Sequence, residues 1–257
     1  MIALTRRQRR RRALAQPFPP AWRDLLSRRL VHWSLLDADE RSRLEDLIRI
    51  FLAHKKWESA NGLVLTDEIR VLISAMACLL VLGREDDDPY RGVTWIEVQP
   101  TTMVSRGPRR FAAEGVVSDA ELPIVGETSF TGPVFIAWDA AREGARHPER
   151  GHNVVYHEFA HQLDMDDGTV DGTPILDPAQ RQRWIDVCTR VYEEVRDGRA
   201  GDLLDPYAGV NPGEFFAVAT EAFFDRPVEL EHHHGDLYDV LRGFYRQDPA
   251  ARARRAG

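Results

Sequence analysis

The sequence predicts an α+β fold, in which a helical N-terminal region precedes a core with a small mixed sheet. Three observations lead to this prediction. Apolar residues recur at helical spacing through much of residues 37–82, and two short β-rich runs lie at 93–98 and 133–138. The third observation is an H-E-x-x-H pentapeptide at residues 157–161, flanked by apolar residues typical of a buried helix.

Composition changes along the chain suggest four segments. Residues 1–16 are rich in arginine and are expected to form a flexible basic tail. The Pro17-Phe18-Pro19-Pro20 cluster breaks the chain, and residues 17–88 are expected to form a helical region packed on the core. Residues 89–250 are expected to form the core itself, and 251–257 a C-terminal tail.

Within the helical region, cap residues mark where helices begin. Asp37 can cap a helix in which Leu44, Ile48 and Phe51 share one face. Thr66 can cap the next helix, which is apolar as far as Leu82. Neither this run nor any other is long enough to span a membrane.

Strands are expected in the first part of the core. Residues 93–98 form one candidate. Residues 133–138 form a second candidate, framed by Gly126 and Gly132 and apolar on both faces, so it is expected in the interior or along a cleft. Its residues Val134, Phe135 and Ile136 are candidates for holding an extended peptide by main-chain pairing. Residues 139–150 are expected to form a loop.

Helices return in the second part of the core, at about residues 178–195, 212–224 and 236–246. Asn211 can cap the middle helix, and Pro212 suits its first position. His232, His233 and His234 lie among acidic residues and are expected in a solvated loop.

The H-E-x-x-H helix carries the clearest chemical signal. Asn153 can cap the start of this helix. Residues four apart lie on one face of a helix, so His157 and His161 can coordinate one metal ion. Glu158 is rotated by about 100° along the helix, which places its carboxylate beside the metal, where it can act as a general base toward water. This arrangement is typical of zinc peptidases.

A catalytic zinc site needs a third protein ligand, and the sequence leaves several candidates open. Glu214 is favoured, because it is an acidic residue in the first turn of an apolar, aromatic helix. Glu221, two turns further along the same face, is either the ligand or a hydrogen-bond acceptor for one of the histidines. Asp164, one turn beyond His161, could accept from a histidine too. The weaker candidates are Asp167, Glu193, Glu194 and the three adjacent histidines His232, His233 and His234.

Composition limits the partners and the compartment. The net charge of −7 argues against direct nucleic-acid binding by the chain as a whole. The two cysteines, Cys78 and Cys188, are far apart and are expected to be reduced. No secretory signal follows the arginines at the N-terminus, so a cytoplasmic location is expected.

Motifs spread over residues 20–250 resemble the Mlc titration factor A family of bacterial zinc peptidases, whose catalytic fold is similar to that of anthrax lethal factor. The resemblance rests on these segments: Phe51 to Trp57, Leu65 to Arg70, Gly126-Glu127, Gly132 to Val134, Gly151 to Asp164, Asp205 to Ala208, Pro212 to Val218, Glu221, and Phe244 to Pro249. The chain departs from the family's usual pattern at Gly209 and Gly213, where alanine is typical.

The resemblance implies a zincin-like core with one Zn²⁺ per chain, held by His157, His161 and Glu214. It also implies that Tyr207 points into the cleft, where it could donate a hydrogen bond to an oxyanion. The expected substrate is a peptide. The family's name raises a second function, in which the protein sequesters a transcriptional repressor of the Mlc type with or without peptidase activity.

Overall fold

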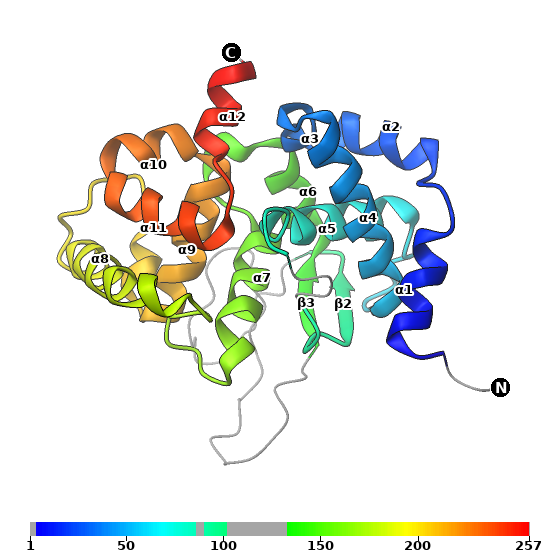
Figure 1. Ribbon diagram of the computed structural model, residues 1–257, viewed down its shortest axis with the longest axis horizontal. Helices are drawn as coiled ribbons and strands as arrows, with labels where there is room; N and C mark the ends of the chain where they lie inside the picture. The colour runs from blue at the N-terminus through cyan, green and yellow to red at the C-terminus, as the bar shows by residue number, and fades with distance from the viewer. Residues whose placement is uncertain (1–3, 86–89, 102–132, 257) are drawn as a thin grey trace.

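The computed structural model describes residues 4–85, 90–101 and 133–256, and within them the chain is mostly helical with one small sheet. Figure 1 shows helix α7 (Val154–Asp164) in the middle of the molecule, between the N-terminal helices and strands on one side and the helices that follow it on the other. The predicted α+β class is confirmed at this level. None of the described helices is both long and apolar enough to cross a membrane.

Five described helices precede the second strand, and three of them begin at a side-chain cap. Asp37 and Glu40 form a reciprocal capping box at the start of the long fourth helix. Thr66 accepts a hydrogen bond from the Ile69 backbone N–H at the start of the fifth. The helices are α1 (Arg6–Leu14), α2 (Pro20–Arg29), α3 (Val31–Leu35), α4 (Ala38–His54) and α5 (Asp67–Leu80).

The sheet contains three described strands, β1 (Lys56–Ser59), β2 (Trp95–Gln99) and β3 (Val134–Ala137), in the order β1-β2-β3. Both pairs are parallel, so the described strands include no antiparallel member of the expected mixed sheet. β2 and β3 lie where the sequence predicted strands. The sequence did not predict β1, because it is short, half polar and only partly buried at the sheet edge. The turns expected at Gly126-Glu127 and Gly132 lie outside the described residues.

Seven described helices follow β3, and of these α6 and α9 contact α7. The seven are α6 (Trp138–Arg146), α7 (Val154–Asp164), α8 (Pro178–Arg196), α9 (Pro212–Asp225), α10 (Pro227–His233), α11 (Gly235–Tyr245) and α12 (Pro249–Ala256), with short 3₁₀ turns η1 (Pro148–Arg150), η2 (Met165–Asp167) and η3 (Pro206–Gly209). The loops predicted at residues 139–150 and 232–234 are therefore partly wrong, because both stretches contain helical residues. Residues 138–146 are helical, and α10 extends the helical structure to His233, because alanines and leucines in these stretches can bury one face against neighbouring helices.

The described parts of both predicted tails, residues 4–16 and 251–256, are largely helical. Thr5 caps α1, which packs against α4, and Arg49 donates to the Leu14 carbonyl oxygen. At the other end, the Arg252 side chain of α12 is buried and bonds to Glu40 and Gln247. Arginine-rich stretches can remain ordered when neighbouring elements supply carbonyl and carboxylate acceptors, and composition alone does not reveal those acceptors.

One apolar core holds α7 in place. Phe159 of α7 packs against Phe51 of α4 and against Tyr90, with ring centroids 5.6 and 4.8 Å apart. On the other side α7 contacts α9, and Trp184, Phe216 and related side chains continue the same buried cluster. Because β1 pairs with β2 and the core is continuous, the segments expected at 17–88 and 89–250 share one sheet and one core.

Candidate metal centre

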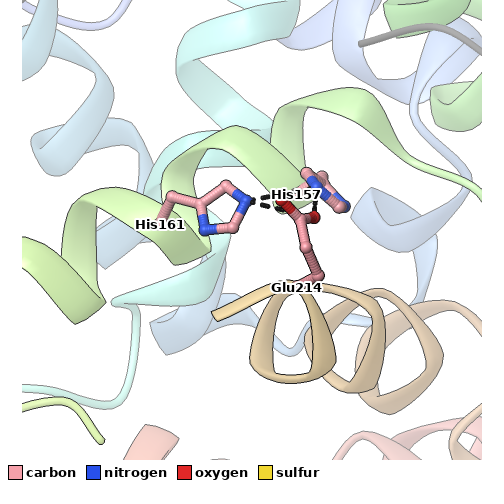
Figure 2. Close-up of side chains that lie close together, drawn as sticks. All are labelled: His157, His161 and Glu214. Carbon is pink, nitrogen blue, oxygen red and sulfur yellow. Dashed lines mark hydrogen bonds and ion pairs between the residues drawn. The ribbon is translucent and has the colours of Figure 1, made fainter. Parts of the chain in front are cut away.

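Helix α7 presents its two histidines side by side. Asn153 precedes the helix, and its side-chain oxygen accepts a hydrogen bond from the Tyr156 backbone N–H at 3.2 Å. His157 and His161 follow one turn apart, and their Nε2 atoms lie 3.2 Å from each other. Figure 2 shows both rings turned toward the same point. The sequence predicted this local geometry from the spacing of four residues.

Glu214 reaches the same point from the first turn of α9. Asn211 caps that helix by accepting from the Glu214 backbone N–H at 2.9 Å, as the sequence predicted. The Glu214 Oε2 atom lies 3.0 Å from Nε2 of His157 and 3.5 Å from Nε2 of His161. Figure 2 shows the carboxylate rising from α9 toward the two rings on α7.

The three atoms have the spacing that a tetrahedral metal ion requires. Zinc binds imidazole nitrogen and carboxylate oxygen at about 2.0–2.2 Å, so two of its ligands lie roughly 3.3 Å apart. The observed separations of 3.0, 3.2 and 3.5 Å agree with that edge length. Among the described residues, this is the group of histidine, cysteine and carboxylate side chains that could hold a metal ion. The residues present therefore fit a zinc ion.

The other candidates for the third ligand lie elsewhere. Asp167 accepts from the Thr169 backbone N–H and hydroxyl in the turn after α7. Glu194 pairs with Arg190, and Glu193 is exposed on α8. His232 and His233 are exposed at the end of α10, and His234 lies next to the Ala200 carbonyl oxygen.

Glu221 accepts a hydrogen bond from Nδ1 of His157, the ring nitrogen that does not face the cluster. It lies two turns beyond Glu214 on α9, and its Oε1 atom is 2.8 Å from Nδ1 of His157. An Nδ1–H bonded to a carboxylate leaves the Nε2 lone pair free to face a metal, which is the usual arrangement around histidine ligands. The Glu221 side chain is buried, and its Oε2 accepts from the Asn153 backbone N–H at 2.5 Å.

Asp164 hydrogen-bonds to the segment that follows α7. Its Oδ2 atom accepts from the Gly172 backbone N–H at 2.8 Å, and the Gly172 carbonyl oxygen accepts from Trp184 at 3.0 Å. The Nδ1 atom of His161 is buried without a hydrogen-bond partner in the described part of the chain. Asp164 therefore anchors the segment after α7, and among the described residues no hydrogen bond joins its carboxylate to His161 Nδ1.

Glu158 and Tyr207 lie beside the cluster. Glu158 is half-buried; burial raises the pKa of its carboxyl group, and the nearby histidines partly offset the increase. Tyr207 lies in η3, with its ring centroid 6.2 Å from that of His157. Burial and the neighbouring Glu214 carboxylate, to which it hydrogen-bonds, raise the pKa of Tyr207, so it stays protonated and can donate.

The cluster strongly shifts the ionisation of its own members. Burial opposes a charge on His157, but the bonds to Glu214 and Glu221 outweigh it and raise the pKa of His157 to about 10. Burial also opposes the charge on Glu214, yet His157 and His161 lower its pKa to about 2. Two carboxylates around one buried ring favour a positive charge at this point, whether proton or metal.

A cleft of about 490 Å³ is lined by His157, Glu221 and Tyr207 among other residues. The sequence did not single out four of the residues that line it: Ala140, Glu143, His147 and Arg150. They come from α6 and from the segment between α6 and α7, and the short motifs carry no signal for them. β3 contacts α7, and Val134 and Ile136 are buried while Phe135 is half-buried.

Comparison with known proteins gives consistent matches along the chain. The family model described as glucose-regulated metallo-peptidase M90 matches residues 4–246. An uncharacterized protein of Synechocystis sp. is 37% identical over 247 residues, covering 94% of this chain and 89% of the relative. Mlc titration factor A of Pectobacterium atrosepticum is 30% identical over 243 residues (87% and 88% coverage), and that of Yersinia pestis 28% over 231 residues (86% and 82%).

Proposed function

The chain belongs to the glucose-regulated metallo-peptidase family M90, and from this premise we propose that it is a zinc-dependent peptidase. The observation that carries the proposal is the convergence of Nε2 of His157, Nε2 of His161 and Oε2 of Glu214 at tetrahedral spacing. These three residues would hold the ion and leave a fourth position open for water, as in catalytic zinc sites.

Zinc, when bound, would supply the Lewis acidity that lowers the pKa of water toward about 7 and polarises a peptide carbonyl. Glu158 accepts the proton of the attacking water, whose oxygen bonds to the carbonyl carbon. Glu158 then returns the proton to the amine nitrogen as the C–N bond breaks, so atoms and charge balance. The raised pKa of its carboxyl group brings it closer to neutrality, where both transfers are efficient.

Two further residues have supporting roles in this mechanism. Glu221 keeps the His157 ring oriented with Nε2 toward the ion. Tyr207, a protonated phenol beside Glu214, donates a hydrogen bond to the oxyanion that develops on the substrate.

We assign the extended substrate to the edge of β3. Among the described strands, β3 pairs on one side only, with β2, and it contacts α7. Main-chain groups at such an edge can pair with a peptide, and the side chains of Val134, Phe135 and Ile136 would then set the local contacts.

The test is cleavage of a peptide library by the whole chain before chelation, after chelation and after zinc is restored. We expect activity that chelation abolishes and zinc recovers. Glu158→Gln should retain zinc but lose hydrolysis, whereas Glu193→Gln, on the exposed face of α8, should behave as wild type. Wild-type hydrolysis by Glu158→Gln would remove the proposed mechanism.

A second function is suggested by the name of the relatives, Mlc titration factor A, which describes those proteins as titrating Mlc. This chain would then bind a transcriptional repressor of that type. Pull-down of such a repressor by wild type, Glu158→Gln and Glu214→Ala separates the two functions. Binding that survives in both variants places the interaction outside the metal site, and no binding by wild type removes this function.

A further inference from the structure

We propose that Asn153 is a positioning residue of the metal centre, which holds Glu221 in the orientation that supports His157. The inference rests on the metal site proposed above and adds a residue that positions Glu221. Asn153 precedes α7 and lies outside the H-E-x-x-H pentapeptide, and its carbonyl oxygen accepts the backbone N–H of His157 at 2.9 Å. Its side chain is completely buried.

The first step is a hydrogen-bonded bridge through one carboxylate. Glu221 accepts from His157 Nδ1 on one oxygen at 2.8 Å and from the Asn153 backbone N–H on the other at 2.5 Å. Both donors belong to the start of the α7 segment, and the acceptor belongs to α9. The Asn153 N–H therefore fixes the rotation of the carboxylate that orients the His157 ring.

The second step is the way the Asn153 side chain holds that N–H in place. Its Oδ1 accepts from the Tyr156 N–H at 3.2 Å, which caps α7. Its Nδ2 points to the sulfur of Met76 in α5, at 3.7 Å. Asparagine combines an acceptor and donors in one short side chain, and both ends are used here.

A second buried carboxylate gives the donor end of Asn153 a further role. Asp225 lies one turn beyond Glu221 on the same face of α9, and its Oδ1 atom is 3.2 Å from Nε2 of His32. Burial raises the pKa of Asp225 to about 6, and His32 and the Asn153 side chain partly offset the increase. Asn153 thus acts on two carboxylates of α9: its backbone N–H donates to Glu221, and its side chain lowers the pKa of Asp225.

Helix α6 packs closely against Asn153 at Gly144. A Cβ atom placed on Gly144 would lie 3.0 Å from the His152 carbonyl oxygen and 3.1 Å from both Cα and Cγ of Asn153. These distances are shorter than ordinary van der Waals contacts, and two of the three atoms are backbone. A larger residue at 144 would have to displace the Asn153 backbone. The position of Asn153 is thus fixed by contacts with four helices, through Met76 of α5, Gly144 of α6, Tyr156 of α7 and Glu221 of α9.

The experiment separates this positioning role from simple helix capping. Asn153→Ser keeps a good N-cap acceptor for α7 but removes the amide donor. The matched control is Asp177→Ser, which exchanges the N-cap of α8, where Asp177 accepts from the Ala179 N–H. For each purified full-length protein, we would measure zinc affinity by chelator competition, the visible spectrum of the cobalt-substituted form, and the melting temperature without metal.

We expect Asn153→Ser to bind zinc about tenfold more weakly than wild type, in the range seen for partners of metal ligands. Its cobalt spectrum should shift, because the position of the His157 ring changes, while Asp177→Ser keeps wild-type affinity and spectrum. Wild-type zinc affinity and cobalt spectrum in Asn153→Ser would overturn the inference and leave the proposed peptidase function intact.

Gly144→Ala provides the second variant if Asn153→Ser does not fold. It leaves the chemistry of residue 153 unchanged and only displaces its backbone, so it should also weaken zinc binding and shift the cobalt spectrum. Gly144→Ala with wild-type values for both would overturn the inference as well. Failure of the wild-type protein to bind zinc would overturn the proposed metal site, and this inference with it.

Discussion

His157 and Glu221 are joined by a 2.8 Å hydrogen bond between Nδ1 of the ring and Oε1 of the carboxylate, across the contact of α7 with α9. Sixty-four positions separate the two residues in the chain. The bond determines which nitrogen of His157 carries the proton, and it leaves Nε2 directed at Glu214 and His161.

Glu221→Ala should therefore weaken zinc binding without removing a ligand. Loss of a carboxylate behind a histidine ligand typically costs about 10- to 100-fold in metal affinity. Chelator competition would measure the change, with Glu193→Ala as the control on an exposed face of α8. Zinc affinity equal to that of wild type would show that His157 does not depend on this bond.

Glu214→Ala should abolish stable zinc binding, because only the two histidines remain. Zinc that binds the folded protein raises its melting temperature by mass action. Wild type should show this increase on addition of zinc, and Glu214→Ala should not. A variant that keeps one zinc per chain after dialysis would exclude Glu214 as a ligand.

Zinc affinity should rise with pH. In the metal-free protein, the pKa of His157 is raised to about 10, so the ring carries a proton at neutral pH that zinc must displace. Glu214, with a pKa of about 2, is already ionised and releases none. Competition between one proton and the metal predicts roughly a tenfold gain in affinity per pH unit between about pH 6 and pH 9.

Calorimetry in buffers of different ionisation enthalpy would count the released protons directly. The expected result near neutral pH is about one proton per zinc from His157. Affinity that stays constant over this pH range, with no proton released, would contradict the prediction.

Tyr207→Phe should reduce catalysis more than binding. The phenol hydroxyl lies beside Glu214 and remains protonated, so it can donate to a developing oxyanion. Removing one such donor costs about 100- to 1000-fold in kcat, with KM little changed. Steady-state kinetics at saturating zinc would test this, and an unchanged kcat would remove Tyr207 from the mechanism.

Arg252→Ala should destabilise the fold, although the residue lies within a predicted tail. Its buried guanidinium bonds to Glu40 of α4 and to Gln247, so α12 is tied to the N-terminal helices. Hydrogen bonds to charged groups predict a loss of about 2–3 kcal/mol in the free energy of unfolding. Urea denaturation would measure it against Arg255→Ala, an exposed neighbour on α12, and equal stability of the two variants would contradict the prediction.

Much of the fold could be predicted from local signals. Asp37, Thr66, Asn153 and Asn211 each cap a helix, because a cap is a contact between residues two or three positions apart. β1, α6 and the terminal helices escaped prediction. Their stability comes from partners far away in the chain, such as β2 for β1 and Glu40 for Arg252.

The candidate site also has a part that local spacing predicts and a part that depends on distant contacts. By itself, the sequence determined that His157 and His161 share one face of a helix with Glu158 beside them, because helical geometry follows from spacing alone. It favoured Glu214 as the third ligand but left Glu221 open, and it gave no sign that Asp164 accepts a hydrogen bond from Gly172. Only the packing of α9 on α7 places Glu214 at 3.0 Å from Nε2 of His157 and Glu221 at 2.8 Å from its Nδ1. Such contacts depend on the position of whole helices in the core, which residue spacing does not encode.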